Sequence, residues 1–400
     1  MIIRYLIANA YGAGGTIKTT LTMAGQLAEE HDVEVVSVFR HRRTPAFAFH
    51  PGLRVRVLTD LAAERSSDPG RWAAAGRSLR AWAQQRPSRL INANDRRYAR
   101  FSLLTDATLL QFLRSLRGGV LVSTRPGLNL AVARLVRPSV VRVAQEHMHL
   151  SRHRNHRPEL YRVIGEQYGR LDAVTTLTTA DADDYRALLG PATPTLAIPN
   201  AVPAAGVRAE LDAKVVIAAG RLTGQKGFDR LIQAFRQVAD RRPDWQLRIF
   251  GKGEGEAELQ ALIDQLDLAG NVRLMGFTRH LPSEMAAASI YAMSSRFEGF
   301  PMVLLEAMAC GLPPVSFDCP TGPRDLIDHG VNGLLVPDGD IDGLAARLLD
   351  LINDDAARRA MGAAALARSR QYTPDAIARR WIELFTELAD AKGTVAATHA

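Results

Sequence analysis

Acidic and basic side chains in two stretches of the C-terminal half have the types and spacing to bind a sugar joined to a phosphate. The stretch "SSRFEGFPMVLLEAMACG" holds Glu298 in a turn and Glu306 inside an otherwise apolar helix. The stretch "AAGRLTGQKGFD" places Arg221 and Lys226 around a glycine turn between a strand and a helix. A carboxylate accepts hydrogen bonds from adjacent hydroxyls, and a guanidinium with an ammonium complements a diphosphate. Each residue also has an alternative without a ligand. Glu298 could be an exposed acid in a turn and Glu306 a charge on a helix surface, and the two cations could be solvated in a loop.

The turn at Glu298 also predicts an anion site made of backbone amides. Pro301 can occupy the first position of a helix running to Cys310, because that position does not need its N–H. The unpaired amides of the first turn and the positive end of the helix dipole attract a phosphate. Since the two nearby glutamates would repel that anion, we expect them to bind hydroxyls.

A glycine-rich stretch near the N-terminus, "ANAYGAGGTIKTTL", differs from a nucleoside triphosphate loop at one position. A P-loop needs its Lys directly after the last Gly, whereas Lys18 follows Ile17 and the last glycine is Gly15. The stretch therefore predicts a strand-to-helix turn for another anion, with Lys18 inside the helix. An ATPase is the rival hypothesis, and ATP hydrolysis compared with hydrolysis of nucleotide sugars separates the two.

Short β-branched runs alternate with helical patterns along the chain, which favours parallel sheets wrapped by helices. A stretch rich in Pro and small residues over 194–212 indicates a linker between two α/β domains. Ligands of such sheets bind beyond the carboxyl ends of the strands. Runs that predict strands are 2–8, 33–39, 119–125, 140–145 and 173–178 in the first domain, and 214–220, 246–251, 272–276, 290–295, 313–317 and 333–337 in the second. We predict a first domain over 1–199, a linker over 200–213, a second domain over 214–371, a C-terminal helix over 372–391 that packs toward the first domain, and a frayed tail over 392–400.

Charge is unevenly distributed along the 400 residues. Residues 1–200 hold 28 Lys and Arg against 16 Asp and Glu, a net charge of +12, and residues 201–400 have a net charge of −4. A basic half attracts an anionic polymer, an anionic membrane surface or nucleic acid. Two cysteines cannot build a disulfide framework, which favours a reducing, cytoplasmic compartment. No run of apolar residues is long enough to span a membrane or to act as a signal peptide.

Taken together, "GRLTGQKGFD" and "SSRFEGFPMVLLEAMACGLPPVS" resemble glycosyltransferase family 4. The resemblance covers the C-terminal half well and the N-terminal half in outline. It implies the GT-B fold, two facing Rossmann-like domains with an interdomain cleft. It also implies transfer of a sugar from a nucleotide sugar with retention of anomeric configuration and without a metal or another cofactor. UDP is the expected nucleotide, on family frequency alone.

The same resemblance implies roles for individual residues. Arg221 and Lys226 would hold the donor diphosphate, Glu298 a sugar hydroxyl, and Glu306 the ribose. Family members carry a histidine near the donor sugar, for which His147 is the candidate and His149 the alternative. The residues implied in donor binding are Gly14, Gly15, Thr16, Arg221, Lys226, Glu298, Gly299, Phe300, Pro301, Met302 and Glu306, and those implied in catalysis are Glu298, His147, Arg221 and Lys226.

Without an evident second carboxylate as nucleophile, we expect the diphosphate to depart and the acceptor hydroxyl to attack the same face of the sugar. A covalent intermediate on Glu298 is the alternative. Metal binding is not expected, because the acidic triplets lie at a helix start and in a turn. The candidates weighed for it are Asp181, Asp183, Asp338, Asp340, His147, His149 and His153.

The sequence indicates the chemical class of the acceptor less clearly than that of the donor. Trp72, Leu79 and Trp82 recur at helical spacing among arginines that include Arg77 and Arg80, a pattern typical of a helix on an anionic membrane. The alternative is a helix that packs on the sheet. The run 316–327 resembles enzymes that glycosylate wall teichoic acid.

We therefore expect an anionic or membrane-associated acceptor, a cell-surface polymer or a lipid-linked glycan, and a protein peripheral to the inner face of the membrane. The acceptor side would include Trp72, Arg77, Arg80, Trp82 and His149. A small natural product is the alternative acceptor. A nucleic-acid partner is not expected, because no aromatic residues lie among "RHRNHR" to stack on bases.

Overall fold

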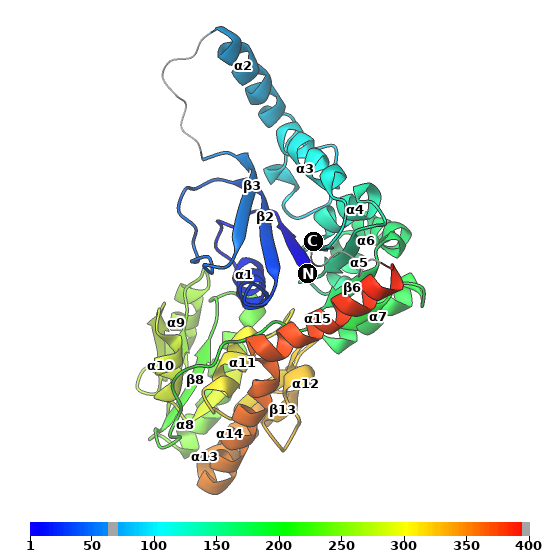
Figure 1. The fold of residues 1–400 in the computed structure, drawn as a ribbon. Helices are drawn as coiled ribbons and strands as arrows, with labels where there is room; N and C mark the ends of the chain where they lie inside the picture. The colour runs from blue at the N-terminus through cyan, green and yellow to red at the C-terminus, as the bar shows by residue number, and fades with distance from the viewer. Residues whose placement is uncertain (63–70, 394–400) are drawn as a thin grey trace. The chain divides into compact units, whose positions relative to one another are not determined.

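The computed structural model describes residues 1–62 and 71–393, and the chain divides into two compact units (Figure 1). Met1–Ala201 and the C-terminal segment from Ile377 form the first unit, and Val202–Ala376 form the second. Each unit has its own parallel sheet. The predicted α/β class, with two sheets wrapped by helices, is confirmed.

The sheet of the first unit has the strand order β3-β2-β1-β4-β5-β6-β7. Its strands are β1 (Ile2–Ile7), β2 (Asp32–Arg40), β3 (Arg54–Asp60), β4 (Val120–Ser123), β5 (Val141–Gln145), β6 (Ala173–Thr176) and β7 (Thr195–Ala197). The sequence patterns predicted β1, β2, β4, β5 and β6. They missed the two edge strands, and β7 lies inside the stretch assigned to the linker.

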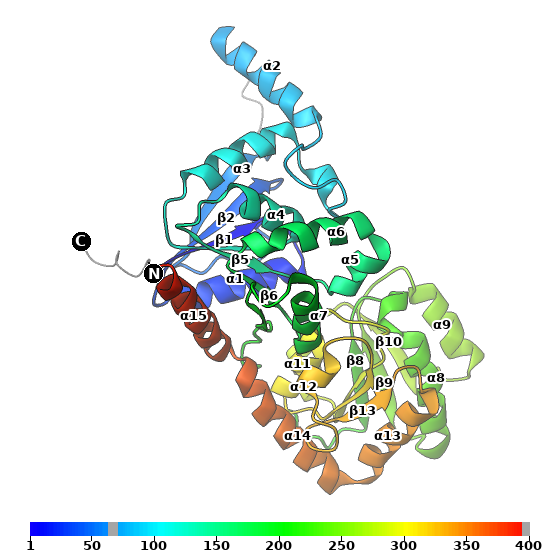
Figure 2. The same ribbon diagram turned by 90° about the vertical axis from the view of Figure 1, so that its right-hand side faces the viewer.

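Most helices of this unit cover the sheet and bury a continuous apolar core. The helices of the unit are α1 (Gly15–Leu27), α2 (Arg71–Gln85), α3 (Leu103–Ser115), α4 (Pro126–Leu135), α5 (Leu150–His156), α6 (Pro158–Gln167), α7 (Thr179–Leu189) and α15 (Pro374–Ala391). One core cluster joins the inward faces of the strands to α3, α4 and α6. In both views α2 extends beyond α3, away from the sheet (Figures 1 and 2).

Helix α15 supplies apolar residues to the first unit from the far end of the chain. Ile377, Trp381 and Phe385 recur at helical spacing and are fully buried. The Arg380 guanidinium donates to the carbonyl oxygen of Ala197 at 2.5 Å. The Lys392 ammonium, just after the helix, donates to the carbonyl oxygen of Pro138 at 2.6 Å.

The sheet of the second unit has the order β10-β9-β8-β11-β12-β13. Its strands are β8 (Val215–Ala219), β9 (Gln246–Phe250), β10 (Val272–Gly276), β11 (Ile290–Met293), β12 (Pro314–Asp318) and β13 (Leu334–Pro337). Each matches one of the six predicted runs, and β12 extends one residue beyond its run. Its helices are α8 (Phe228–Arg241), α9 (Glu256–Gln265), α10 (Leu281–Ala286), α11 (Met302–Ala309), α12 (Pro323–Leu326), α13 (Ile341–Asn353) and α14 (Asp355–Ser369). The core packs the strands against α8, α9 and α13.

Each sheet has a point where the strand order reverses direction. In the first unit this point lies between β1 and β4, and in the second between β8 and β11. Loops that leave the carboxyl ends of such neighbouring strands diverge and leave space for a ligand. None of the described helices has the length and apolar character that crossing a membrane would require.

Candidate functional site

The loops that follow β8 and β11 are joined by hydrogen bonds, so the two stretches singled out in the sequence meet. The amide of Arg296 donates to the carbonyl oxygen of Gln225 at 2.8 Å. The Gln225 side chain donates to the carbonyl oxygen of Phe297 at 3.1 Å, and the Ser294 hydroxyl donates to that of Lys226 at 3.1 Å. Residues about seventy positions apart therefore form one structure at the switch point of the second sheet.

Gly227 makes this close approach feasible. Its φ is +62°, in the left-handed region, and a Cβ added there would lie 2.1 Å from the carbonyl oxygen of Ser294. Only glycine fits such a position without moving one of the loops. Gly227 also precedes the first residue of α8, so the loop, the helix and the end of β11 are positioned together.

Lys226 and Glu298 form an ion pair at this junction, with 2.7 Å between Nζ and Oε1. The same Oε1 accepts a hydrogen bond from the Ser295 hydroxyl at 2.5 Å. Glu298 is 7% exposed and keeps a second carboxylate oxygen for a ligand. Arg221, five residues before Lys226, is exposed and has no ion-pair partner among the described residues. The structure thus brings together a balanced pair and a cation open to an anion.

The start of α11 differs in part from the sequence expectation. Pro301 is the N-cap, with ψ 76°, and the helix begins at Met302, so Pro301 is not the first helical residue as predicted. The amide of Met302 donates to the carbonyl oxygen of Phe300 at 2.9 Å and is not an unpaired donor. The Phe300 ring is buried beside Tyr372. Gly299 lies in the same turn, and half-buried Glu306 lies within α11.

A pocket of about 480 Å³ opens in the first unit at the carboxyl ends of β1, β2, β4 and β5. The glycine-rich turn forms part of its wall, including Gly14, Gly15 and Thr16. Gly14 is the N-cap of α1, which has no side-chain cap and no acid in its first turn. Lys18 lies inside α1, as the sequence predicted.

Glu146 lies in the wall of this pocket as the last member of a buried polar network. It is 1% exposed, and its Oε1 accepts from the Tyr168 hydroxyl at 2.5 Å and from the Asn129 amide at 2.7 Å. The Ser123 hydroxyl donates to the Asn129 oxygen at 2.6 Å. Burial raises the pKa of Glu146 to about 8 because no cation offsets the lost hydration. The carboxyl is therefore largely protonated at neutral pH.

The structure separates the two candidate histidines. His147 lines the pocket, and its buried Nε2 has no hydrogen-bond partner among the described residues. Burial lowers the pKa of His147 to about 4, so the ring is neutral. His149 is the N-cap of α5 and its Nδ1 accepts from the Ser151 amide. It does not line the pocket described above, so its assignment to the acceptor side has no geometric support.

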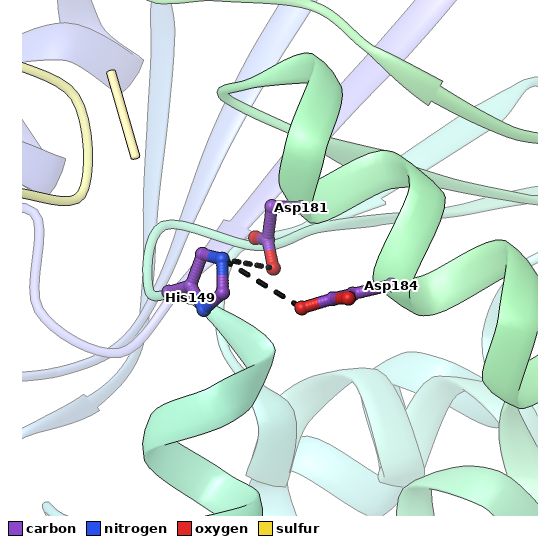
Figure 3. A group of neighbouring side chains, drawn as sticks. All are labelled: His149, Asp181 and Asp184. Carbon is purple, nitrogen blue, oxygen red and sulfur yellow. Dashed lines mark ion pairs between the residues drawn. The ribbon is translucent and has the colours of Figure 1, made fainter. Parts of the chain in front are cut away.

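His149 instead faces Asp181 and Asp184, both on α7, with Nε2 3.8 Å from a carboxylate oxygen of each (Figure 3). Among the described residues this is the group whose spacing would suit a metal ion. Asp181 already accepts from the Leu150 amide at 2.8 Å. Since His149 and Asp181 each satisfy an amide at the start of α5, a structural link between α5 and α7 accounts for their positions.

The residues predicted for membrane contact lie on α2. Leu79 is 66% exposed and Trp82 is 50% exposed, and the Arg86 guanidinium lies 5.5 Å from the Trp82 ring centre. Arg80 is exposed and donates to the carbonyl oxygen of Asp60. The side chains of Trp72 and Arg77 lie outside the described residues. The alternative of a helix packed on the sheet is wrong for the described part of α2.

Sequence reasoning missed the arginines that line the pocket, namely Arg42, Arg96, Arg97, Arg100 and Arg125. It also left Glu146 out of the site. Two sequence features could have indicated this pocket. One is the cluster of arginines in "NDRRYAR", and the other is the adjacent pair Glu146 and His147 at the end of a strand. Neither signal says where an irregular loop folds.

Comparisons with known proteins show which families and structures the chain is similar to. Residues 205–368 match the family model described as "Glycosyl transferases group 1". An exopolysaccharide phosphotransferase of Streptomyces coelicolor is 37% identical over 392 residues, which are 97% of this chain and 41% of that protein. A poly(glycerol-phosphate) alpha-glucosyltransferase of Bacillus subtilis is 28% identical over 227 residues, 55% of this chain and 33% of that protein. The chain thus spans less than half the length of these curated relatives.

Similarity to solved structures extends over both units. The structure of S. aureus TarM in complex with UDP and alpha-GlcNAc-glycerol superposes with a TM-score of 0.73 at 15% identity, covering 96% of this chain and 99% of that one. The predicted GT-B fold is therefore confirmed. The family match and the fold together support a transferase.

Proposed function

We propose that the protein is a retaining glycosyltransferase of family 4, which moves a hexose from a UDP-sugar to a hydroxyl of an anionic acceptor. The observation that carries the proposal is the Lys226–Glu298 pair at 2.7 Å, beside exposed Arg221, at the switch point of the second sheet. This junction lies within the part matched by the glycosyl transferase model. The TarM complex contains UDP, which supports UDP as the donor nucleotide.

In this proposal, the donor diphosphate meets Arg221 and Lys226, and Glu298 accepts hydrogen bonds from sugar hydroxyls through its second oxygen. Glu306 accepts from the ribose. Phe300, Pro301 and the turn at Gly299 shape the sugar site. No protein-bound metal is required, because two cations and backbone amides stabilise the charge that develops on the leaving group.

The proposed reaction breaks the bond between the anomeric carbon and the diphosphate oxygen. The acceptor oxygen then forms its bond on the same face of an oxocarbenium-like sugar. Its proton passes to the departing phosphate, so the protein needs no separate base. His147, which is neutral, lies in the wall of the first unit's pocket, where its ring nitrogen can accept a hydrogen bond from a hydroxyl of a ligand bound there.

The proposed acceptor is a cell-surface polymer or a lipid-linked glycan, reached at the inner face of the membrane. The excess of positive charge in residues 1–200 favours an anionic acceptor. The names of the relatives support the same class, since they refer to an exopolysaccharide and to poly(glycerol phosphate).

Replacing Glu298 tests the proposal. Glu298→Gln keeps an acceptor for the Ser295 hydroxyl and frees Lys226 from its partner. We expect UDP to raise the unfolding temperature of both proteins, since a ligand of the native state stabilises it. Turnover of UDP-sugar should fall by about a hundred-fold in the variant, because the charged acceptor of the sugar hydroxyls is lost.

The control is Glu258→Gln, which changes an exposed glutamate in α9 of the same unit. It should leave turnover unchanged. The proposal fails if no UDP-, GDP- or ADP-sugar shifts the unfolding temperature. A glycosyl-enzyme found by mass spectrometry in the wild type and absent from Glu298→Gln would replace the same-face mechanism with a covalent one.

A further inference from the structure

The pocket of the first unit carries an excess of cations without ion-pair partners in the part of the chain that the structure describes. Arg42, Arg96, Arg97 and Arg100 line it, and among residues 1–62 and 71–393 no carboxylate pairs with any of the four. Arg97 is exposed overall, but partial desolvation and the neighbouring guanidiniums of Arg125, Arg96 and Arg100 lower its pKa. An anion in the pocket would relieve this repulsion.

Asp95 fixes the arginine-bearing segment against the start of α4. Its carboxylate accepts from the Arg125 guanidinium at 2.7 and 3.2 Å. It also accepts from the amides of Arg97 at 2.8 Å and Gly127 at 3.0 Å. Because this buried carboxylate has four donors already, it holds the segment in place and leaves the other arginines uncompensated.

The opposite wall adds donors and no opposing charge. The N-terminus of α1 contributes its first turn, with Gly14 as N-cap and no acid among its first residues, and such a turn attracts anions. Glu146 is the one acid in the lining, and its raised pKa keeps it largely protonated at neutral pH. His147 adds a ring nitrogen without a partner among the described residues.

We propose that this pocket binds a phosphate ester of the acceptor, through Arg97, Arg100 and the first turn of α1. The enzyme would thereby select acceptors that carry a phosphate beside the reacting hydroxyl. The volume of about 480 Å³ exceeds that of a phosphate and leaves room for the polyol or sugar that carries it. This inference rests on the proposed function, since it assigns the donor diphosphate to Arg221 and Lys226 in the other unit. A diphosphate of the donor is the other source of the same chemistry.

Titration calorimetry of the full chain with glycerol 3-phosphate and, separately, with UDP tests the proposal. In Arg97→Gln/Arg100→Gln, we expect the affinity for glycerol 3-phosphate to fall by about ten-fold or more, because two charge-assisted contacts are lost. The affinity for UDP should change by less than about three-fold. Arg97→Lys/Arg100→Lys should recover part of the lost affinity, because the charge remains while the planar fork does not.

A matched control removes two positive charges elsewhere in the same unit. Arg137→Gln/Arg170→Gln changes two exposed arginines outside the pocket and should leave both affinities unchanged. All the arginines replaced are exposed, so the variants should unfold at the temperature of the wild type.

Two results would overturn the inference. One is a wild type that does not bind glycerol 3-phosphate, and the other is a double variant that loses UDP and retains glycerol 3-phosphate, which would assign the pocket to the donor. If the wild type binds glycerol 3-phosphate through these arginines but neither binds UDP nor consumes UDP-sugar, the pocket stands and the proposed function fails.

Discussion

At the scale of single residues, two buried glutamates are stabilised in opposite ways. Glu298 has the Lys226 ammonium at 2.7 Å, so its charge is balanced. Glu146 has two neutral donors, the Tyr168 hydroxyl and the Asn129 amide, and no ion-pair partner among the described residues. The first arrangement suits a carboxylate that binds hydroxyls, and the second suits a protonated carboxyl in the wall of an anion pocket.

The protonated state of Glu146 predicts a loss of stability as the pH rises. Its pKa is about 8 in the folded protein against 4.5 when unfolded, so the folded state holds the proton more tightly. The contribution of Glu146 to the free energy of unfolding is largest below pH 4.5, and it declines as the pH rises toward 8. Glu146→Gln keeps an oxygen for both donors and should remove this decline, which amounts to about 3 kcal/mol between pH 4.5 and pH 7.

Denaturant unfolding at several pH values measures this effect as a difference between the variant and the wild type. Glu387→Gln, an exposed position in the same unit, is the control and should follow the wild type at every pH. Parallel curves for Glu146→Gln and the wild type from pH 5 to pH 8 would show that Glu146 is ionised when folded.

At the scale of elements, the loops at the strand ends carry the candidate binding residues, and glycines determine how closely these loops approach each other. Gly227 and Gly224 lie in the same loop after β8 but differ in their surroundings. A Cβ at Gly227 would lie 2.1 Å from the Ser294 carbonyl oxygen, whereas a Cβ at Gly224 would meet nothing within 4 Å. The pair therefore offers a test of whether contact between the two loops is needed.

Gly227→Ala should destabilise the second unit by about 2 kcal/mol or more, because the left-handed backbone and the clash both oppose a side chain. Affinity for UDP should fall as Lys226 moves. Gly224→Ala should change stability by less than about 0.5 kcal/mol. Thermal unfolding with and without UDP checks both variants, and equal behaviour of the two would contradict the role given to Gly227.

Helix α2 predicts membrane contact through Leu79 and Trp82, which are exposed on a helix with arginines around them. The wild type should sediment with vesicles that contain phosphatidylglycerol at low salt and less so as salt screens the charges. Leu79→Ser/Trp82→Ser should reduce the bound fraction several-fold without loss of stability. Absence of the wild type from the pellet at low salt would reject the prediction.

The control for this experiment removes exposed apolar side chains elsewhere. Phe277 is 67% exposed and Val331 is 57% exposed, both in the second unit. Phe277→Ser/Val331→Ser should sediment like the wild type. A loss of binding equal to that of the α2 variant would mean that general hydrophobicity, rather than α2, drives the contact.

The elements also show what could be read from the sequence. Strand β8 is a continuous apolar run, and β1 is apolar except for Arg4, so both were predicted from their composition. Edge strand β3, "RVRVLTD", alternates arginine with valine at its start, and β7 has three residues, so both gave weak signals. The loop motifs at Lys226 and Glu298 were found because each has a local pattern. The arginine pocket was missed because it depends on where one irregular loop folds.

At the scale of the whole molecule, two sheets with the same reversal of strand order each offer a binding place, and the two places differ in charge. The second unit presents a balanced ion pair with one exposed arginine at the loop junction. The first presents a pocket lined by five arginines, of which only Arg125 has an ion-pair partner among the described residues. This division follows the net charge of the two halves, +12 and −4, and agrees with separate sites for a donor and an anionic acceptor.

The position of helix α15 in the sequence affects the order in which the two units can fold during translation. The strands of the first unit are synthesised before residue 201, but Ile377, Trp381 and Phe385, which are buried and belong to the same unit, come after the whole second unit. During translation the second unit can therefore bury its core before α15 packs on the first unit. The first unit waits with apolar surface exposed until α15 leaves the ribosome, and in that interval it is the part of the chain most in need of a chaperone.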